Sequence, residues 1–296
     1  MTISTTCAIC KTFGNSTKIY DSTIDESTFS VEVFSARRLP DRRHYQWVTC
    51  NACGLFRSDP IQDIDLFTLY KESTFDYSNE LHGLSNSYRK LLEKTDGNFE
   101  GKSLLELGGG NGFFLLEAKK LGFKNLIEIE PSISARANAD ASIQNSFISE
   151  MLSPNLIKQG TQDYIAAFHV LDHLPNPSES VQILKSFLKE RGYLIVAVHN
   201  VRSISATLLK NRSPIFDVEH TYLFSKETLR LLLLEAGFSN IVIKHYKNSY
   251  SLAYILHLLP MPSAIKSKIL DSNLSALLRK IKITVPLGNI YAIASK

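Results

Sequence analysis

Residues Leu104 to Leu116 read LLELGGGNGFFLL: a short apolar run, a turn dense in glycine and a second apolar run. This order predicts a buried strand that leads into a helix through a ligand-binding loop. Glycine suits such a loop because it tolerates positive φ angles and lets the backbone approach a ligand closely. Glu106 falls near the strand end, where a carboxylate is rarely buried without a partner. The stretch therefore predicts a site for a small, polar and partly cationic ligand.

Strand and helix signals alternate along the chain after this loop. The helix that begins at Phe113 is expected to end at Gly122, because glycine is a common helix C-cap. Further strands are predicted at 126–130, 146–149, 164–168 and 193–198, with helices near 133–141 and 177–188. This alternation indicates an α/β fold with a parallel sheet flanked by helices. Ligands bind such sheets at the carboxyl ends of the strands, which are followed by the glycine loop, Glu130, Glu150 and His169.

The glycine loop distinguishes between two classes of cofactor. A dinucleotide site requires G-x-G-x-x-G, and the loop fails this pattern in every register; the sixth position counted from Gly108, for example, is Phe113. The loop instead reads Glu106-x-Gly108-x-Gly110-x-Gly112. This E-x-G-x-G-x-G pattern resembles motif I of the class I S-adenosylmethionine-dependent methyltransferases.

Later segments resemble the same family in the same order. Glu130, 18 residues after Gly112, stands where the family has the acid that binds the cofactor ribose. The run Val170–Pro177 is similar to the family's "VLEHLPDP", with Asp172 in place of glutamate, and His199 replaces the proline of a "PN" that ends the fifth strand. The residues from Glu219 to Phe238 are similar to the family's "EHxxxFSxxTL…AGF".

The resemblance implies a Rossmann-like, seven-stranded methyltransferase sheet flanked by helices, whose sixth and seventh strands (241–246 and 289–296) form a hairpin that makes the last strand antiparallel. It implies S-adenosyl-L-methionine as the cofactor. The residues that we expect to bind this cofactor are Tyr77, Glu106, Gly108, Gly110, Asn111, Gly112, Glu130, Pro131, Glu150, Phe168 and His169.

All four cysteines lie near the N-terminus, as Cys7-Ala8-Ile9-Cys10 and Cys50-Asn51-Ala52-Cys53. Paired Cys-x-x-Cys motifs are typical of a tetrahedral zinc site, although the 39 residues between them exceed the usual spacing. Four thiolates leave no open coordination position, so the predicted Zn²⁺ is structural. Disulfides are the alternative, and they are disfavoured in a cytoplasmic protein.

Three parts of the chain are predicted. Residues 1–60 form a zinc ribbon with a β-hairpin insertion that includes a strand at Thr28–Phe34, and residues 61–99 form an aromatic linker or lid and a helix. Tyr70 and Tyr77 could cover a ligand or belong to the core. Residues 100–296 form the methyltransferase domain, with substrate-side insertions at 201–225 and 250–288.

A subgroup of the family carries such a ribbon and acts on sugars or other small molecules, and this chain resembles its sugar C-methyltransferases and the methyltransferases of bacterial surface-glycan clusters. In the former, a tyrosine precedes the Glu-His pair. Here Phe216-Asp217-Val218 precedes Glu219, so the methylated atom stays open. A hydroxyl or carbon acceptor needs a base, and histidine is the natural choice near neutral pH.

Four histidines fall at or beyond strand ends, and their roles differ. His220 is the first candidate for the base, with Glu219 orienting it or binding substrate hydroxyls; the alternative is that His220 caps the helix near Ser225. His173 is expected to fix a turn and His169 to line the cofactor pocket. His199 has no assigned role.

Composition limits the alternatives. The chain has 296 residues, of which 44% are hydrophobic and 21% charged, as in ordinary globular proteins. The apolar run Ser251–Leu259 is shorter than the ~20 residues of a membrane span. Because Met1–Thr6 lacks the features of a signal peptide, we expect a cytoplasmic protein without a membrane span.

The expected partner is a sugar-like small molecule, and a homodimer stays open. An RNA methyltransferase that uses the basic segment Arg37–Arg43 is an alternative, but a net charge of +4 without a long basic stripe makes nucleic acid an unfavoured partner. A zinc-ribbon binding protein without catalytic activity is a further alternative, and the intact glycine loop and Glu130 argue against it.

Overall fold

A computed structural model describes residues 2–24, 43–73, 81–258 and 274–296. Its centre is a seven-stranded sheet with the order β12-β13-β10-β9-β6-β7-β8. The strands are β6 (Ser103–Leu107), β7 (Asn125–Ile129), β8 (Phe147–Ile148), β9 (Gln162–Phe168), β10 (Leu188–His199), β12 (Ser239–Ser251) and β13 (Lys282–Ser295). The predicted Rossmann-like sheet is confirmed.

The strand directions also agree with the prediction. The five strands β8, β7, β6, β9 and β10 are parallel to their neighbours, whereas β13 runs antiparallel to both β10 and β12. Because parallel strands end at one edge of a sheet, the residues that follow β6, β7, β9 and β10 come together there.

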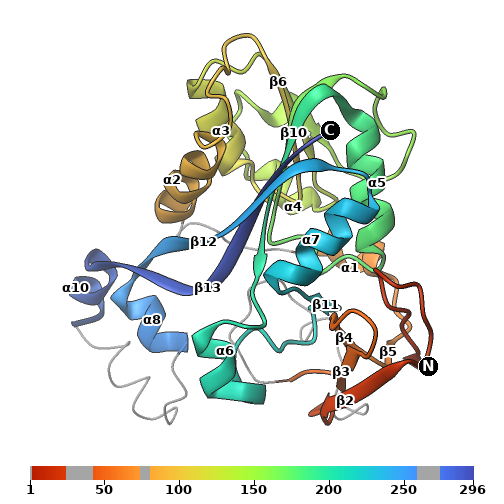
Figure 1. Ribbon diagram of the computed structural model, residues 1–296. Helices are drawn as coiled ribbons and strands as arrows, with labels where there is room; N and C mark the ends of the chain where they lie inside the picture. The colour runs from red at the N-terminus through yellow and green to blue at the C-terminus, as the bar shows by residue number, and fades with distance from the viewer. Residues whose placement is uncertain (1, 25–42, 74–80, 259–273) are drawn as a thin grey trace.

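Helices cover both faces of this sheet (Figure 1). One face packs against α2 (Leu81–Leu92) and α3 (Phe113–Lys120), and the other against α5 (Pro177–Phe187) and α7 (Lys226–Glu235). Alternate strand residues enter the two cores: Leu105 and Leu107 of β6 face one, and Leu104 faces the other. This alternation follows from the two-residue period of a strand.

Several predicted boundaries are wrong. The helix expected over 133–141 is only α4 (Ile133–Ala137), because the Asp140 carboxylate accepts a hydrogen bond from the Ser142 amide and forms a turn instead. The last two strands are longer than predicted: β12 extends to Ser251, and β13 begins at Lys282, so both ends of the 250–288 insertion are strand. Between them lie α8 (Leu252–Leu258) and α10 (Leu274–Lys280).

The N-terminal part forms a second sheet that is shared with the rest of the chain. Its order is β11-β4-β3-β2, made of β2 (Ser16–Tyr20), β3 (Trp47–Cys50), β4 (Phe56–Ser58) and β11 (Tyr222–Leu223). Strand β11 follows the Glu219-His220 pair and pairs antiparallel with β4. A separate two-stranded sheet consists of β1 (Thr2–Ile3), which precedes β2 in the sequence, and β5 (Ile61–Gln62), which follows β4.

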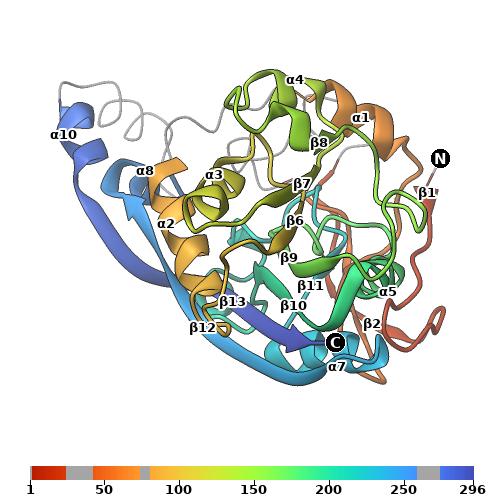
Figure 2. The same cartoon turned by 90° about the horizontal axis from the view of Figure 1, so that it is seen from above.

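The linker places α1 (Leu66–Glu72) beside α4, as the view from above shows (Figure 2). The Ser132 hydroxyl donates a hydrogen bond of 2.9 Å to the carbonyl of Ser73, which ends α1. The remaining short helices are α6 (Ile204–Leu209) and single 3-10 turns at Gln144–Ser146 and Lys210–Arg212. The predicted strand at 28–34, Tyr77 and nearly all of the basic segment lie outside the described residues. Among the helices of the described ranges, none has the length and apolar character that a membrane span requires.

Candidate active site

The glycine loop crosses the carboxyl end of β6 and leads directly into α3. Gly108, Gly110 and Gly112 have φ angles of +67°, +62° and +74°, a region that L side chains rarely adopt. At Gly108 a Cβ atom would also lie 2.6 Å from Val170 Cγ2. The predicted loop is therefore built from glycine for both conformational and steric reasons.

Two fully buried carboxyl groups support this loop from below. Glu106 on β6 pairs in register with Glu128 on β7, and Glu128 Oε1 accepts a hydrogen bond of 2.8 Å from the Gly109 amide. The Oε2 atom of each carboxyl has no hydrogen-bond donor within the described part of the chain, so a proton shared between the two groups satisfies both. Burial raises the pKa of Glu106 to about 8 and that of Glu128 well above its ordinary value.

Glu130 lies at the end of β7, as predicted, and faces the loop. Its carboxylate accepts hydrogen bonds from the Gly110 amide (3.1 Å) and from the amide of Ser132, which follows Pro131 (2.9 Å). Asn111 contributes a buried Oδ1 atom that has no hydrogen-bond partner among the residues described here. An unsatisfied buried acceptor beside a glycine loop fits a ligand that carries hydrogen-bond donors.

The other predicted cofactor residues differ in their surroundings. Phe168 is buried, with its ring stacked on Tyr88 at a centroid distance of 4.1 Å, so its observed contacts are those of a core residue. Glu150 follows β8 at the sheet edge, where it is exposed. Tyr77 lies outside the described residues. Tyr70 on α1 is partly buried. Desolvation and the nearby charges of Glu219, Asp172 and Glu130 raise its pKa, which places it beside the site.

A row of four histidines borders the loop at the same edge of the sheet. The ring centroids are 4.6 Å apart for His169 and His199, 4.9 Å for His199 and His220, and 4.7 Å for His220 and His173. His169 has φ +56° directly after β9, and its Nε2 lies 2.6 Å from Tyr246 Oη. The sequence suggested each histidine separately but did not predict this histidine row.

Asp172 lies against the histidine row and is fully buried. Its Oδ2 atom is 2.6 Å from His199 Nδ1. Burial by itself would raise the pKa of this carboxyl, but the hydrogen bond from His199 and the nearby histidines outweigh burial and hold the pKa well below its usual range. Asp172 is therefore a permanent anion within the histidine row.

The two residues of the predicted catalytic pair, Glu219 and His220, have different neighbours. His220 Nδ1 donates to the Ile215 carbonyl oxygen at 2.7 Å, and this hydrogen bond orients the ring. Glu219 Oε2 instead lies 3.9 Å from His173 Nδ1. Burial lowers the pKa of His220, and burial together with the charge of His220 lowers that of His173 to about 3. Both histidines are therefore neutral at pH 7.

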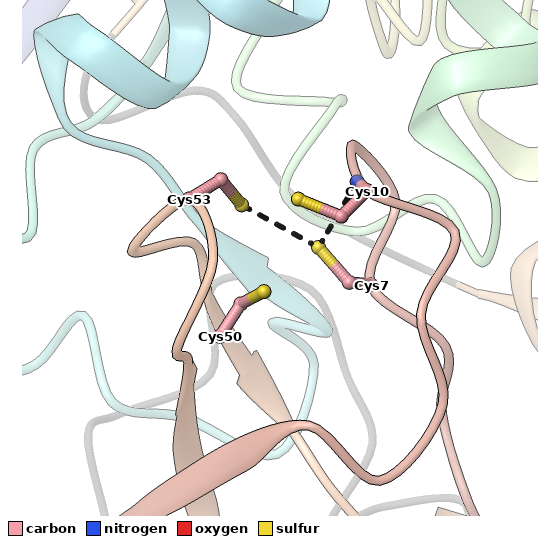
Figure 3. Close-up of side chains that lie close together, drawn as sticks. All are labelled: Cys7, Cys10, Cys50 and Cys53. Carbon is pink, nitrogen blue, oxygen red and sulfur yellow. Dashed lines mark hydrogen bonds between the residues drawn. The ribbon is translucent and has the colours of Figure 1, made fainter.

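The four cysteines converge in the N-terminal part (Figure 3). Their sulfur atoms all lie within 4.8 Å of one another, and Cys7 Sγ is 3.6 Å from Cys53 Sγ. Tetrahedral Zn–S bonds of ~2.3 Å require sulfur atoms ~3.8 Å apart, which this separation matches. The Cys10 amide also lies 3.4 Å from Cys7 Sγ, as suits a thiolate.

The N-terminal sheet is bonded directly to the segment that carries His220. The Ser58 hydroxyl donates a 3.0 Å hydrogen bond to the His220 carbonyl, and the Ser58 amide donates one of 2.9 Å to the Thr221 carbonyl. Cys7 and Cys50 also share a hydrophobic core with α5 and α7. Strand β4 thus lies between β3, which ends at Cys50, and β11, which follows His220.

The profile of a family described as "Methyltransferase domain" matches residues 80–243, just over half of the chain. The chain belongs to this methyltransferase family. It is an S-adenosylmethionine-dependent methyltransferase of class I, as the resemblance in the sequence implied. The matched region contains the glycine loop, Glu130 and all four histidines of the row.

Curated relatives and solved structures agree with this assignment. This methyltransferase is 26% identical over 162 residues to a ubiquinone biosynthesis O-methyltransferase of Shewanella pealeana, which covers 51% of this chain and 68% of that protein. A protein of the same name from Glaesserella parasuis is 30% identical over 130 residues, 40% of this chain and only 53% of the relative.

Two solved structures share the fold of this methyltransferase. An S-adenosylmethionine-dependent methyltransferase from Archaeoglobus fulgidus aligns with a TM-score of 0.52 at 17% identity, over 78% of this chain and all of that one. Phosphoethanolamine N-methyltransferase 2 of Haemonchus contortus aligns with a TM-score of 0.53 at 11% identity, over 86% of this chain and 64% of that one.

Sequence reasoning missed three features of the methyltransferase site: Glu128, the contact between Asp172 and His199, and Tyr246. Glu128 carried a signal, because it is a second acid in an otherwise apolar strand, two residues before Glu130. Asp172 and His199 were each visible as departures from the family pattern. Nothing local marks Tyr246, which approaches His169 only through the sheet order.

Proposed function

We propose that this methyltransferase transfers the methyl group of S-adenosylmethionine to an oxygen atom of a small-molecule acceptor. The observation that carries the proposal is the place of the histidine row at the edge of the sheet that also holds the glycine loop and Glu130. A proton acceptor thus lies beside the cofactor site. A positioned base of this kind contributes roughly 10²–10⁴-fold to a reaction that removes a hydroxyl proton.

The residues that would hold the cofactor are those of the loop, with Glu130 for the ribose hydroxyls and Asn111 Oδ1 for a donor of the cofactor. When bound, S-adenosylmethionine supplies an electrophilic methyl group. The chain contributes mainly alignment, which can be worth ~7–11 kcal/mol in favourable cases. His220 and Glu219 are proposed to contact the acceptor, and Tyr70 to close the site from α1.

The acceptor class is supported by two observations. The matched relatives are named O-methyltransferases, which supports oxygen as the methylated atom. The four cysteines and the aromatic linker resemble the subgroup that acts on sugars, so we propose a sugar, a nucleotide-sugar or a surface-glycan precursor. The same cysteine geometry supports a structural Zn²⁺ held by Cys7, Cys10, Cys50 and Cys53.

The proposal is tested in two stages. S-Adenosylhomocysteine should raise the thermal midpoint of the wild-type protein, and Glu130→Ala should weaken the binding of S-adenosylhomocysteine. Glu190→Ala is the matched control, because the Glu190 side chain is 85% exposed. Glu150→Ala tests the predicted contact of that residue. Formation of S-adenosylhomocysteine is then followed with nucleotide-sugars and with a dihydroxybenzoate as the phenolic comparison.

Each stage has an outcome that contradicts the proposal. Absence of any thermal response to S-adenosylhomocysteine would contradict the cofactor site. Turnover with the phenol and with none of the nucleotide-sugars would support the methyltransferase activity but contradict the proposed sugar acceptor. Salt-sensitive binding of RNA in a gel shift, with methylation of that RNA, would favour the nucleic-acid alternative instead.

A further inference from the structure

Two departures from the family motifs contact each other in the fold. Asp172 replaces a glutamate after β9, and His199 replaces a proline at the end of β10. They are 27 positions apart in the sequence, yet the parallel pairing of β9 and β10 brings Asp172 Oδ2 to 2.6 Å from His199 Nδ1. A fully buried carboxylate that contacts a partly exposed imidazole is an arrangement that can position a histidine for proton transfer.

We propose that His199 is the catalytic base of the methyl transfer and that Asp172 is the residue that positions it. This inference rests on the proposed transfer to a hydroxyl acceptor. The acceptor hydroxyl gives its proton to His199 Nε2 while its oxygen forms the bond to the methyl group. The electron pair of the broken methyl–sulfur bond stays on sulfur, and the imidazolium later releases the proton to solvent.

The hydrogen bond fixes which nitrogen of His199 accepts the proton. An ionised carboxylate only accepts hydrogen bonds, so His199 Nδ1 must donate to Asp172. The lone pair then lies on Nε2, away from Asp172. As in serine-protease triads, the carboxylate keeps the imidazole in the useful tautomer and stabilises the imidazolium that forms.

His220 and His173 are placed less well to act as the base. His220 donates its Nδ1 proton to a neutral carbonyl, which stabilises an imidazolium less than a carboxylate does. Burial lowers the pKa of both His220 and His173, so their charged forms are disfavoured. The His199 side chain is 24% exposed, which leaves room for an acceptor, whereas Asp172 is fully buried.

Asp172 is itself held rigidly. Its backbone carbonyl accepts hydrogen bonds from the amides of Thr221 (2.9 Å) and Tyr222 (3.2 Å). This contact joins the turn after β9 to the segment that β4 anchors. The backbone of Asp172 is therefore held in place, and its side chain can hold the His199 ring in one orientation. A base that must reach a small acceptor requires such positioning.

The experiment compares His199→Ala, Asp172→Asn and His220→Ala, with His245→Ala on the exposed side of β12 as the matched control. With the acceptor found above, His199→Ala and Asp172→Asn should each lower kcat by roughly 10²–10⁴-fold. Affinity for S-adenosylhomocysteine should stay unchanged, which shows that the fold and the cofactor site are intact. Added imidazole should restore part of the turnover of His199→Ala only.

A second measurement does not depend on turnover. NMR of protein labelled with ¹⁵N-histidine should place the neutral-state proton of His199 on Nδ1 in the wild type and remove this preference in Asp172→Asn. A wild-type proton on Nε2 would overturn the inference. So would His199→Ala turnover within about tenfold of wild type, or a loss that imidazole does not restore. If no acceptor is methylated but the Nδ1 proton is found, the proposed function fails and the assigned geometry stands.

Discussion

The carboxyl pair beneath the glycine loop makes stability depend on pH in an unusual direction. Glu106 has a pKa of about 8 in the fold, against an ordinary value of 4.5, because it is buried beside Glu128. The folded state therefore binds a proton that the unfolded chain releases. The stabilisation is complete below pH 4.5 and is lost as the pH rises through about 8.

The contribution of Glu106 alone can be worked out between pH 6.5 and 8.5, and the comparison with a variant at Glu128 removes the titration of the groups that both proteins share. His173, whose pKa falls from 6.5 to about 3, contributes stability that is complete above pH 6.5. Between pH 6.5 and 8.5 the wild-type protein should therefore lose about 2 kcal/mol of unfolding free energy through Glu106. Glu128→Gln should reduce this loss, because the amide does not titrate, donates permanently to the Glu106 carboxylate and keeps an oxygen for the Gly109 amide.

The assay is urea denaturation of both proteins, loaded with zinc, at several pH values across this window. The difference between the two proteins cancels the titration of groups that they share. Parallel loss of stability in wild type and Glu128→Gln would refute the reasoning. So would a difference in stability, wild type minus Glu128→Gln, that is constant or rises with pH.

Three further predictions concern the loop and the N-terminal sheet. Gly109→Ala places a Cβ 2.3 Å from Glu106 Cδ and 2.4 Å from Glu128 Oε2, so unfolding free energy should fall by about 1–3 kcal/mol with loss of S-adenosylhomocysteine binding. Gly160→Ala is the comparison: its Cβ meets open space but its φ is +65°, so it reports backbone strain without a clash, and a smaller loss of stability in Gly109→Ala than in Gly160→Ala would contradict the steric argument. Removing zinc with a chelator should lower both the thermal midpoint and turnover, because β4 of the N-terminal sheet pairs with β11 beside the histidine row. Added Zn²⁺ should restore both. Full turnover in protein that metal analysis shows to be free of zinc would mean that the N-terminal part does not support the active site. Ser58→Ala removes the 3.0 Å hydrogen bond to the His220 carbonyl and should cost about 1 kcal/mol with reduced turnover, whereas unchanged kinetics would show that β4 does not position this segment.

The sequence by itself determined the fold class, the cofactor loop and the cysteine cluster. Each depends on spacing within a short stretch: glycines alternating after Glu106, an acid at the end of the next strand, and two Cys-x-x-Cys pairs. Local patterns of this kind predict structure without knowledge of the fold, because backbone conformation and periodicity depend on neighbouring residues. The domain limits at 60 and 100 stay a prediction, although β11 shows that the first sheet is completed by a distant strand.

Only the tertiary structure decided which side chains share a proton. Register between β6 and β7 places Glu106 against Glu128, and the order of β9 and β10 places Asp172 against His199. The sequence also ranked His220 above His199, because it shows neither the Ile215 carbonyl nor the exposed fraction of each ring. Hydrogen bonds between residues on different strands depend on strand order and register, and burial depends on the whole core, so neither can be read from the spacing of residues along the chain.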